Sequence, residues 1–156
     1  MGLQDSIARD TVSELPIREV ITLPATCTVR QAMRRMRARR LGCVIAVDEQ
    51  GKPVGKFTER LLMRLLVNEA GGLDQPIAKF MYADASAVSL STPLAKLVEQ
   101  MQSRHLRFMC VVNEQGKAVG LTGQKGLMEY IAEHFPRAVL VQRMKPFLAL
   151  DEREGA

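Results

Sequence analysis

The sequence predicts an α+β fold built from two similar units, and three observations support this prediction. A shift of 65 residues aligns the chain with itself, so that residues 47–55 lie over residues 112–120 without a gap. Each copy shows the same succession of apolar, turn-forming and amphipathic segments, as expected for an internal duplication. The composition, with 47% apolar and 25% charged residues, is that of a globular protein and argues against a disordered or fibrous chain.

The first unit begins with a short extended stretch over residues 20–23. Thr28 is the expected N-cap of a helix over residues 28–40, because apolar residues follow it at helical spacing. Gly42 is expected to end this helix.

A hairpin and a second helix complete the first unit. Residues 43–47 are nearly continuously apolar and rich in β-branched side chains, which is typical of a strand buried on both faces. Residues 48–51 supply the turn, residues 53–58 the return strand, and residues 59–68 the helix. The apolar residues expected to face inward from this helix are Leu61, Leu62, Leu65 and Leu66.

The second unit repeats this order. Residues 87–90 are extended, a helix begins near Thr92 and Pro93, and a hairpin and a last helix follow at 108–112, 118–122 and 126–134. Units of about 60 residues bury little surface alone, so we expect the two to pack as one body. The predicted boundaries are an N-terminal helical segment at 1–15, repeats at 16–75 and 76–136, and a C-terminal extension at 137–156.

The formal charge of +5 comes from one segment, because residues 30–40 contain six arginines and no acid, and the rest of the chain carries −1. The three cysteines, Cys27, Cys43 and Cys110, cannot all pair within one chain. We expect reduced, buried thiols in a cytoplasmic protein. No apolar run approaches the roughly 20 residues of a membrane span, so no membrane association is expected.

The β-α-β-β-α order, with an apolar strand, an acidic hairpin ending in glycine and a Val-Gly step, resembles the CBS domain (the cystathionine β-synthase motif) over residues 15–135. The resemblance implies two CBS repeats packed as one pseudo-twofold Bateman module. It further implies a stand-alone regulatory unit that binds AMP, ADP, ATP or S-adenosylmethionine without a required cofactor. A homodimer formed through the helices and a regulated protein partner are also implied.

In that family, a Gly-x-x-Thr/Ser-x-x-Asp segment holds the ribose and the phosphate of the ligand. The first repeat contains Gly55 and Thr58, but Leu61 stands where the family has the ribose-binding carboxylate. In the second repeat, Gly123 and Gly126 replace both the threonine and the acid. Loss of a charged hydrogen-bonding partner weakens binding by roughly tenfold to a hundredfold.

The resemblance therefore places the better binding site at the first repeat, with Lys56, Arg60 and Arg107 near the phosphate. In the alternative interpretation, Thr58 only caps a helix and the three cations are solvated. The residues expected to line the site are Gly55, Lys56, Phe57, Thr58 and Arg60 from one repeat, and Leu106, Arg107 and residues 83–86 from the other.

A competing interpretation is a ligand-free interaction module with decayed sites, which uses the dimer surface or the arginine-rich helix at 30–40. Nucleic-acid binding is disfavoured, because no zinc-finger, RNP-like or helix-turn-helix signature accompanies the arginines. No enzyme activity, catalytic residue or metal site is expected, since His105 and His134 lack ligand spacing with the cysteines.

Overall fold

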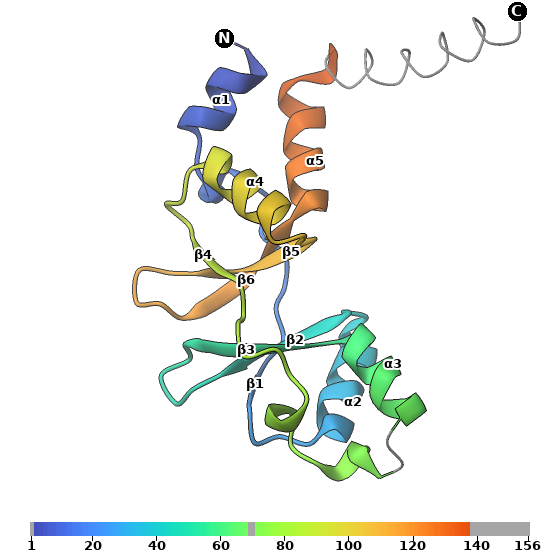
Figure 1. Cartoon of the computed structure of the whole chain (residues 1–156). Helices are drawn as coiled ribbons and strands as arrows, with labels where there is room; N and C mark the ends of the chain where they lie inside the picture. The colour runs from blue at the N-terminus through green and yellow to red at the C-terminus, as the bar shows by residue number, and fades with distance from the viewer. Residues whose placement is uncertain (1, 69–70, 138–156) are drawn as a thin grey trace, which may run out of the picture.

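Two three-stranded sheets flanked by helices make up the computed structural model, which describes residues 2–68 and 71–137 (Figure 1). The first repeat contains β1 (Thr22–Pro24), α2 (Val29–Arg39), β2 (Cys43–Val47), β3 (Pro53–Thr58) and α3 (Glu59–Asn68). The second contains β4 (Ala87–Ser89), α4 (Leu94–Ser103), β5 (Phe108–Val112), β6 (Ala118–Gly123) and α5 (Gln124–His134). The predicted α+β class and the repeated order of elements are confirmed. Among the described residues, no helix combines the length and the apolarity that a bilayer span requires.

The two sheets share one topology. In each sheet the short first strand pairs in parallel with the central strand, which pairs antiparallel with the third. The register shifts between Ala46 and Val47 in one sheet and between Val111 and Val112 in the other. These residues are 65 positions apart, so the duplication extends to an irregularity of the backbone.

The first helix of the first repeat begins as predicted and ends differently. The Thr28 hydroxyl accepts a hydrogen bond from the amide of Gln31 at 3.1 Å, and the Gln31 side chain accepts one from the Thr28 amide at 2.9 Å, which is a capping box. The prediction that Gly42 ends the helix is wrong. The left-handed residue that follows the helix is Arg40, with φ 54°, and His105 has φ 52° after the corresponding helix.

The expected inward face of α3 needs one correction. Leu61 and Leu65 are buried, but Leu66 is 53% exposed, together with Met63 and Val67 on the same helix. A ten-residue helix on the outside of a small sheet can bury only one stripe of side chains, and Leu66 lies outside that stripe.

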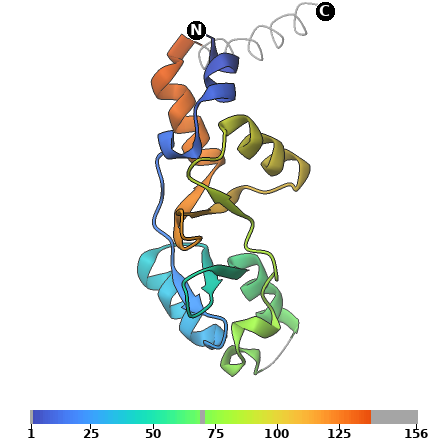
Figure 2. The same ribbon diagram turned by 90° about the vertical axis from the view of Figure 1, so that its left-hand side faces the viewer.

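Each repeat completes its core with a segment that precedes the other repeat. Val12 and Leu15 pack in the second core, and the amide of Val12 donates to the carbonyl of Thr92 at 2.9 Å. Ile77 packs in the first core, and its amide donates to the carbonyl of Cys27 at 2.8 Å. Figure 2 shows the two connecting segments running between the repeats on opposite sides. The repeats are therefore intertwined rather than merely adjacent.

The N-terminal segment forms two short helices, α1 (Leu3–Arg9) and a 3₁₀ turn at Val12–Glu14, which pack against the second repeat. Asp10, which follows α1, accepts a hydrogen bond from the hydroxyl of Tyr130 in α5. Residues 138–156 of the predicted C-terminal extension lie outside the described part of the chain.

A third apolar cluster joins the two sheets face to face, and it consists of Cys43, Ile45, Ala85, Cys110 and Leu121. Cys27, Cys43 and Cys110 are all buried and free, as predicted. Burial raises the pKa of Cys43 and of Cys110 to about 11, so both thiols are protonated at neutral pH. The edges of this sheet-to-sheet contact define the cleft described next.

Candidate functional site

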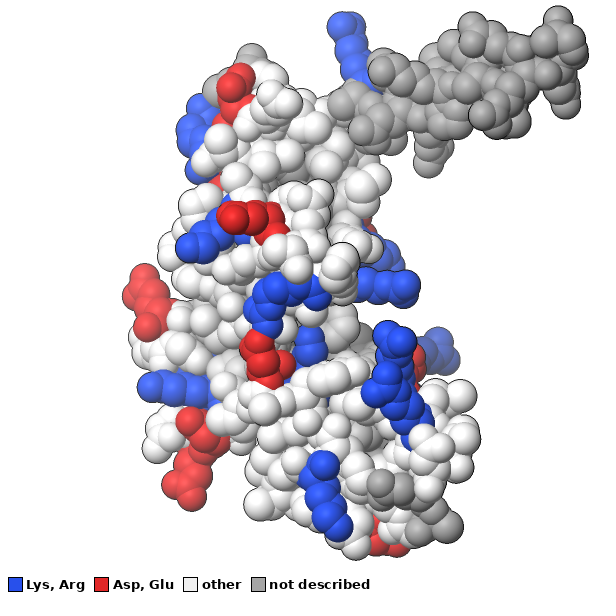
Figure 3. All heavy atoms as spheres, viewed as in Figure 1, with Lys and Arg blue, Asp and Glu red and all other residues white. Residues whose placement is uncertain are grey.

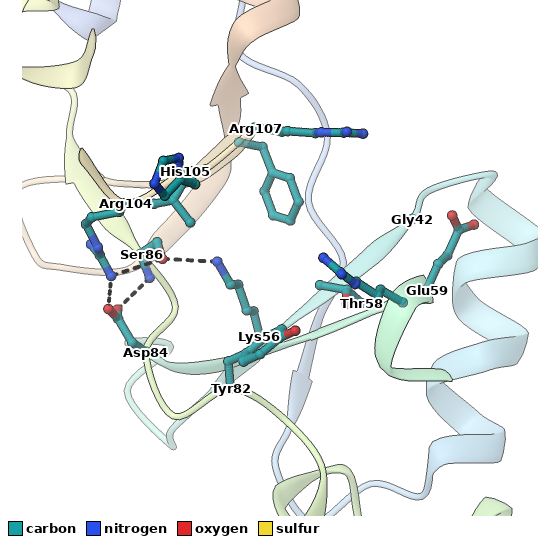
Figure 4. Close-up of a pocket in the computed structure, with 13 residues that line it drawn as sticks. Gly42, Lys56, Thr58, Glu59, Tyr82, Asp84, Ser86, Arg104, His105 and Arg107 are labelled. Carbon is teal, nitrogen blue, oxygen red and sulfur yellow. Dashed lines mark hydrogen bonds and ion pairs between the residues drawn. The ribbon is translucent and has the colours of Figure 1, made fainter. Parts of the chain in front are cut away.

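A cleft of about 920 Å³ opens between the two repeats (Figure 4). One wall is the end of β3 and the start of α3. The other wall comes from residues 82–86, which lead into β4, and from residues 104–108, which join α4 to β5. In the space-filling view, basic side chains gather at the level where the two repeats meet (Figure 3).

Of the seven site residues predicted by name, five line this cleft, namely Lys56, Thr58, Arg60, Leu106 and Arg107, and from the predicted segment 83–86 Asp84 and Ser86 line it as well. Phe57 does not line it, because successive side chains of a strand point to opposite faces, and this ring is fully buried in the first core. Gly55 is covered by the crossing segment. A Cβ there would lie 2.7 Å from the carbonyl oxygen of Tyr82, so glycine permits this close approach.

Lys56 is the most deeply buried cation of the cleft, with 8% of its surface exposed. Its Nζ donates to the hydroxyl of Ser86 at 3.1 Å and lies 5.5 Å from the ring centroid of Phe108 and 5.8 Å from that of Tyr82. Burial lowers the pKa of Lys56. The alternative in which all three predicted cations are solvated therefore fails for Lys56, whereas Arg60 and Arg107 are exposed.

Asp84 and Ser86, which belong to the expected segment 83–86, form a polar network with Arg104, a residue that the sequence analysis missed. The Ser86 amide donates to the Asp84 carboxylate at 2.7 Å, and the Arg104 guanidinium pairs with the same carboxylate. The hydrogen bond from the Ser86 amide lowers the pKa of Asp84, and the Arg104 charge acts in the same direction. The duplication held a sequence signal for this pair, because the first repeat has an acid and an arginine at the same two positions, 65 residues earlier. Those residues, Glu19 and Arg39, also form an ion pair.

The residue at the position of the family's ribose carboxylate does not reach the cleft. Leu61 lies in the first core, and its amide donates to the hydroxyl of Thr58 at 3.4 Å. Thr58 therefore caps the start of α3. Thr58 and the start of that helix lie at the cleft wall, where helix N-termini favour anions, although the Glu59 amide already donates to the carbonyl of Gly42 at 2.9 Å.

The corresponding positions of the second repeat have a different chemistry. Leu121, buried at 8% exposure, stands where the first repeat has Lys56. Gly123 stands at the position of Thr58, and a Cβ there would overlap the carbonyl oxygen of Arg107 and lie 2.7 Å from Cα of Phe108. The backbone contact between β6 and β5 therefore excludes a threonine at this position, and the two repeats present different side chains at corresponding positions.

The arginine-rich face of α2 lies outside the cleft. Arg30 makes a two-point contact with Asp74, at 2.9 and 3.1 Å, and Arg39 pairs with Glu19. Four others are exposed and make no ion pair with any described residue, namely Arg34, Arg35, Arg37 and Arg40. Within residues 2–68 and 71–137, no group of three His, Cys, Asp or Glu side chains is placed to hold a metal ion.

Comparison with known proteins agrees with this architecture. The sequence model described as "CBS domain" matches twice, over residues 12–68 and 77–133. An uncharacterized protein of Methanopyrus kandleri is 28% identical over 138 residues, which are 88% of this chain and 69% of that protein.

Two solved structures illustrate the similarity of fold. A CBS domain protein from Pyrobaculum aerophilum, complexed with AMP, is 25% identical with a TM-score of 0.66. The similarity spans 85% of this chain and 96% of that protein's chain. The CBS domain pair of protein MJ0100, in complex with 5′-methylthioadenosine and S-adenosyl-L-methionine, is 17% identical with a TM-score of 0.68. The similarity spans 79% of this chain and 96% of that one.

Proposed function

The chain belongs to the CBS-domain family, and from this premise we propose that it is a regulatory module whose cleft between the repeats binds an adenine nucleotide or a related adenosyl ligand. The single observation that carries the proposal is the cleft of about 920 Å³, which combines cations, a capped helix start and aromatic rings. The AMP held by the Pyrobaculum aerophilum protein and the adenosyl ligands held by the MJ0100 pair support it.

Each wall of the cleft has a chemical part in this proposal. Thr58 and the start of α3 offer hydrogen-bond donors to a phosphate, and the exposed Arg60 and Arg107 add positive charge. The rings of Tyr82 and Phe108 offer apolar surface to a base. No carboxylate at position 61 binds the ribose in this proposal, because the residue there is a leucine whose side chain lies in the first core.

The regulatory output that we propose is a ligand-dependent change in the geometry of the repeats or of a homodimer, which a protein partner detects. Exposed apolar side chains on α3 and α5 support a dimer through these helices. Met63 is 63% exposed, Leu66 53%, Val67 80% and Met128 54%. Apolar side chains gathered on the outside of a small protein commonly mark an interface.

A thermal-shift titration with AMP, ADP, ATP and S-adenosylmethionine tests the proposal, because a ligand that binds only the folded state raises the melting temperature. Thr58→Ala should weaken the response. Thr28→Ala is the matched control, since it removes the N-cap of α2, which lies outside the cleft. A flat response to every ligand at millimolar concentration would reject the proposal.

A second candidate function rests on four exposed arginines of α2 and its C-cap, Arg34, Arg35, Arg37 and Arg40, which make no ion pair with any described residue. If the cleft binds no ligand, the function would lie on this surface instead, and its positive charge suits an acidic protein partner. Retention on a polyglutamate matrix should then fall with rising salt and be lost when Arg34 and Arg37 are both changed to Glu. Retention that survives this charge reversal would exclude the arginine face.

A further inference from the structure

Lys56 is an incompletely paired cation inside the cleft. Its ammonium carries three donors, of which the structure accounts for one, the 3.1 Å hydrogen bond to Ser86. No carboxylate among the described residues lies within 4.0 Å of Nζ. The rings of Phe108 and Tyr82 lie 5.5 and 5.8 Å from Nζ, but they leave its other donors without an oxygen acceptor. A buried ammonium with unsatisfied donors is destabilising unless something else supplies acceptors.

The fold itself does not need a lysine at this position. In the second repeat Leu121 occupies the equivalent site of β6 and is buried to the same extent, at 8% exposure. Leu121 packs in the apolar cluster between the sheets, so an apolar side chain satisfies the architecture there. The lysine of the first repeat is therefore better explained by a ligand than by packing.

Asp84 attracts the Lys56 ammonium, but Arg104 repels it and opposes that attraction. Asp84 is engaged by the Ser86 amide and by Arg104. The Glu59 side chain is directed towards Gly42, on the far side from Lys56 (Figure 4). Because Arg60 and Arg107 also line the cleft, its positive charge exceeds its negative charge.

We infer that Lys56 selects the charge class of the ligand, so that the cleft accepts adenine ligands that carry phosphate and rejects cationic adenosyl ligands such as S-adenosylmethionine. This inference rests on the proposed function, in which the cleft binds an adenosine moiety. Phosphate oxygens are strong acceptors for the free donors of Lys56. A sulfonium would instead bring a second positive charge next to a buried one, where the low dielectric strengthens the repulsion.

Isothermal titration with three ligands that share adenine and ribose tests this inference. AMP carries a phosphate, 5′-methylthioadenosine is neutral, and S-adenosylmethionine carries a sulfonium. The wild-type protein should bind AMP most tightly and S-adenosylmethionine least. Lys56→Leu, which copies Leu121, should weaken AMP binding by about tenfold to a hundredfold. It should leave 5′-methylthioadenosine binding unchanged and improve the binding of S-adenosylmethionine.

Lys96→Leu is the matched control, because Lys96 is an exposed lysine of α4 outside the cleft. It should leave all three affinities unchanged. Lys56→Met provides a second variant if the leucine disturbs folding, and thermal melts monitored by circular dichroism report the fold of each protein. Removal of an unpaired buried charge should preserve or raise the melting temperature.

The outcomes separate this inference from the function on which it rests. If S-adenosylmethionine binds the wild type as tightly as AMP, or if AMP binding does not depend on Lys56, charge selection is overturned while the binding module stands. If no adenosine ligand binds, the proposed function fails. Binding of inorganic triphosphate that is lost in Lys56→Leu would then still support the anion-selecting role, and no such binding would reject it as well.

Discussion

Gly123→Ala should destabilise the protein strongly, because it places one carbon against the backbone of the neighbouring strand. The new Cβ would overlap the carbonyl oxygen of Arg107 and lie 2.7 Å from Cα of Phe108. Non-bonded carbons approach to about 3.5 Å, so the two strands must separate by about 0.8 Å. Overpacking of this kind costs about 1–3 kcal/mol. We expect the upper value, since neither contact is a flexible side chain.

Urea denaturation measures this loss directly, and a thermal melt should show a decrease of about 6–12 °C for a loss of about 3 kcal/mol. Gly42→Ala is the control, because the three atoms nearest to its Cβ all belong to the side chain of Glu59, with Oε2 at 3.2 Å. That variant should change the unfolding free energy by less than about 0.5 kcal/mol. If the two variants were equally stable, backbone crowding would not be the reason that the second repeat lacks a threonine at this position.

Three further changes test the core, a buried hydroxyl and the proposed dimer. Leu97→Ala removes a fully buried side chain of the second core and should cost about 2–5 kcal/mol in urea denaturation; a loss below about 1 kcal/mol would contradict the packing. Tyr130→Phe deletes the donor to Asp10 and should cost about 1 kcal/mol. Burial, and then the hydrogen bond to Asp10, raises the pKa of Tyr130 to about 12 from an ordinary 10.0. Stability contributed by its neutral form is therefore present below pH 10 and lost between pH 10 and 12. Alkaline denaturation should be shallower in Tyr130→Phe, and identical pH profiles would refute this. Leu66→Glu places a charge on the exposed apolar face of α3 and should convert a homodimer into a folded monomer by light scattering, whereas a persistent dimer would assign the interface elsewhere.

The duplication made most of the fold predictable from sequence. Two copies of one pattern, 65 residues apart, supported each other wherever a single segment was ambiguous, and the structure has the same elements in both. Thr28 was predicted as an N-cap from local chemistry alone, because a capping box involves residues only three apart. The helix end was misassigned to Gly42, since a left-handed arginine at position 40 has no local sequence signal.

The candidate site was predictable only in part, for a reason of distance along the chain. Thr58 and Arg60 belong to a short motif, and the resemblance to a family indicated which residues of the other repeat should face them. Residues 83–86 were expected at the cleft, but Arg104 was missed, because its place there depends on an ion pair with Asp84, 20 residues away in the sequence. Strand alternation separated Lys56, which faces the cleft, from Phe57, which faces the core.

The sequence by itself determined the two units, their order of elements and the leucine at the position of the family's ribose-binding acid, because periodicity, caps and motif positions are local properties of the chain. Only the tertiary structure decided that the core of each repeat includes side chains from the segment that precedes the other repeat. It also decided that Lys56 is buried while Arg60 and Arg107 are exposed, and that β6 has no room for a threonine at position 123. Those outcomes depend on which distant atoms occupy the same space, and no local pattern carries that information.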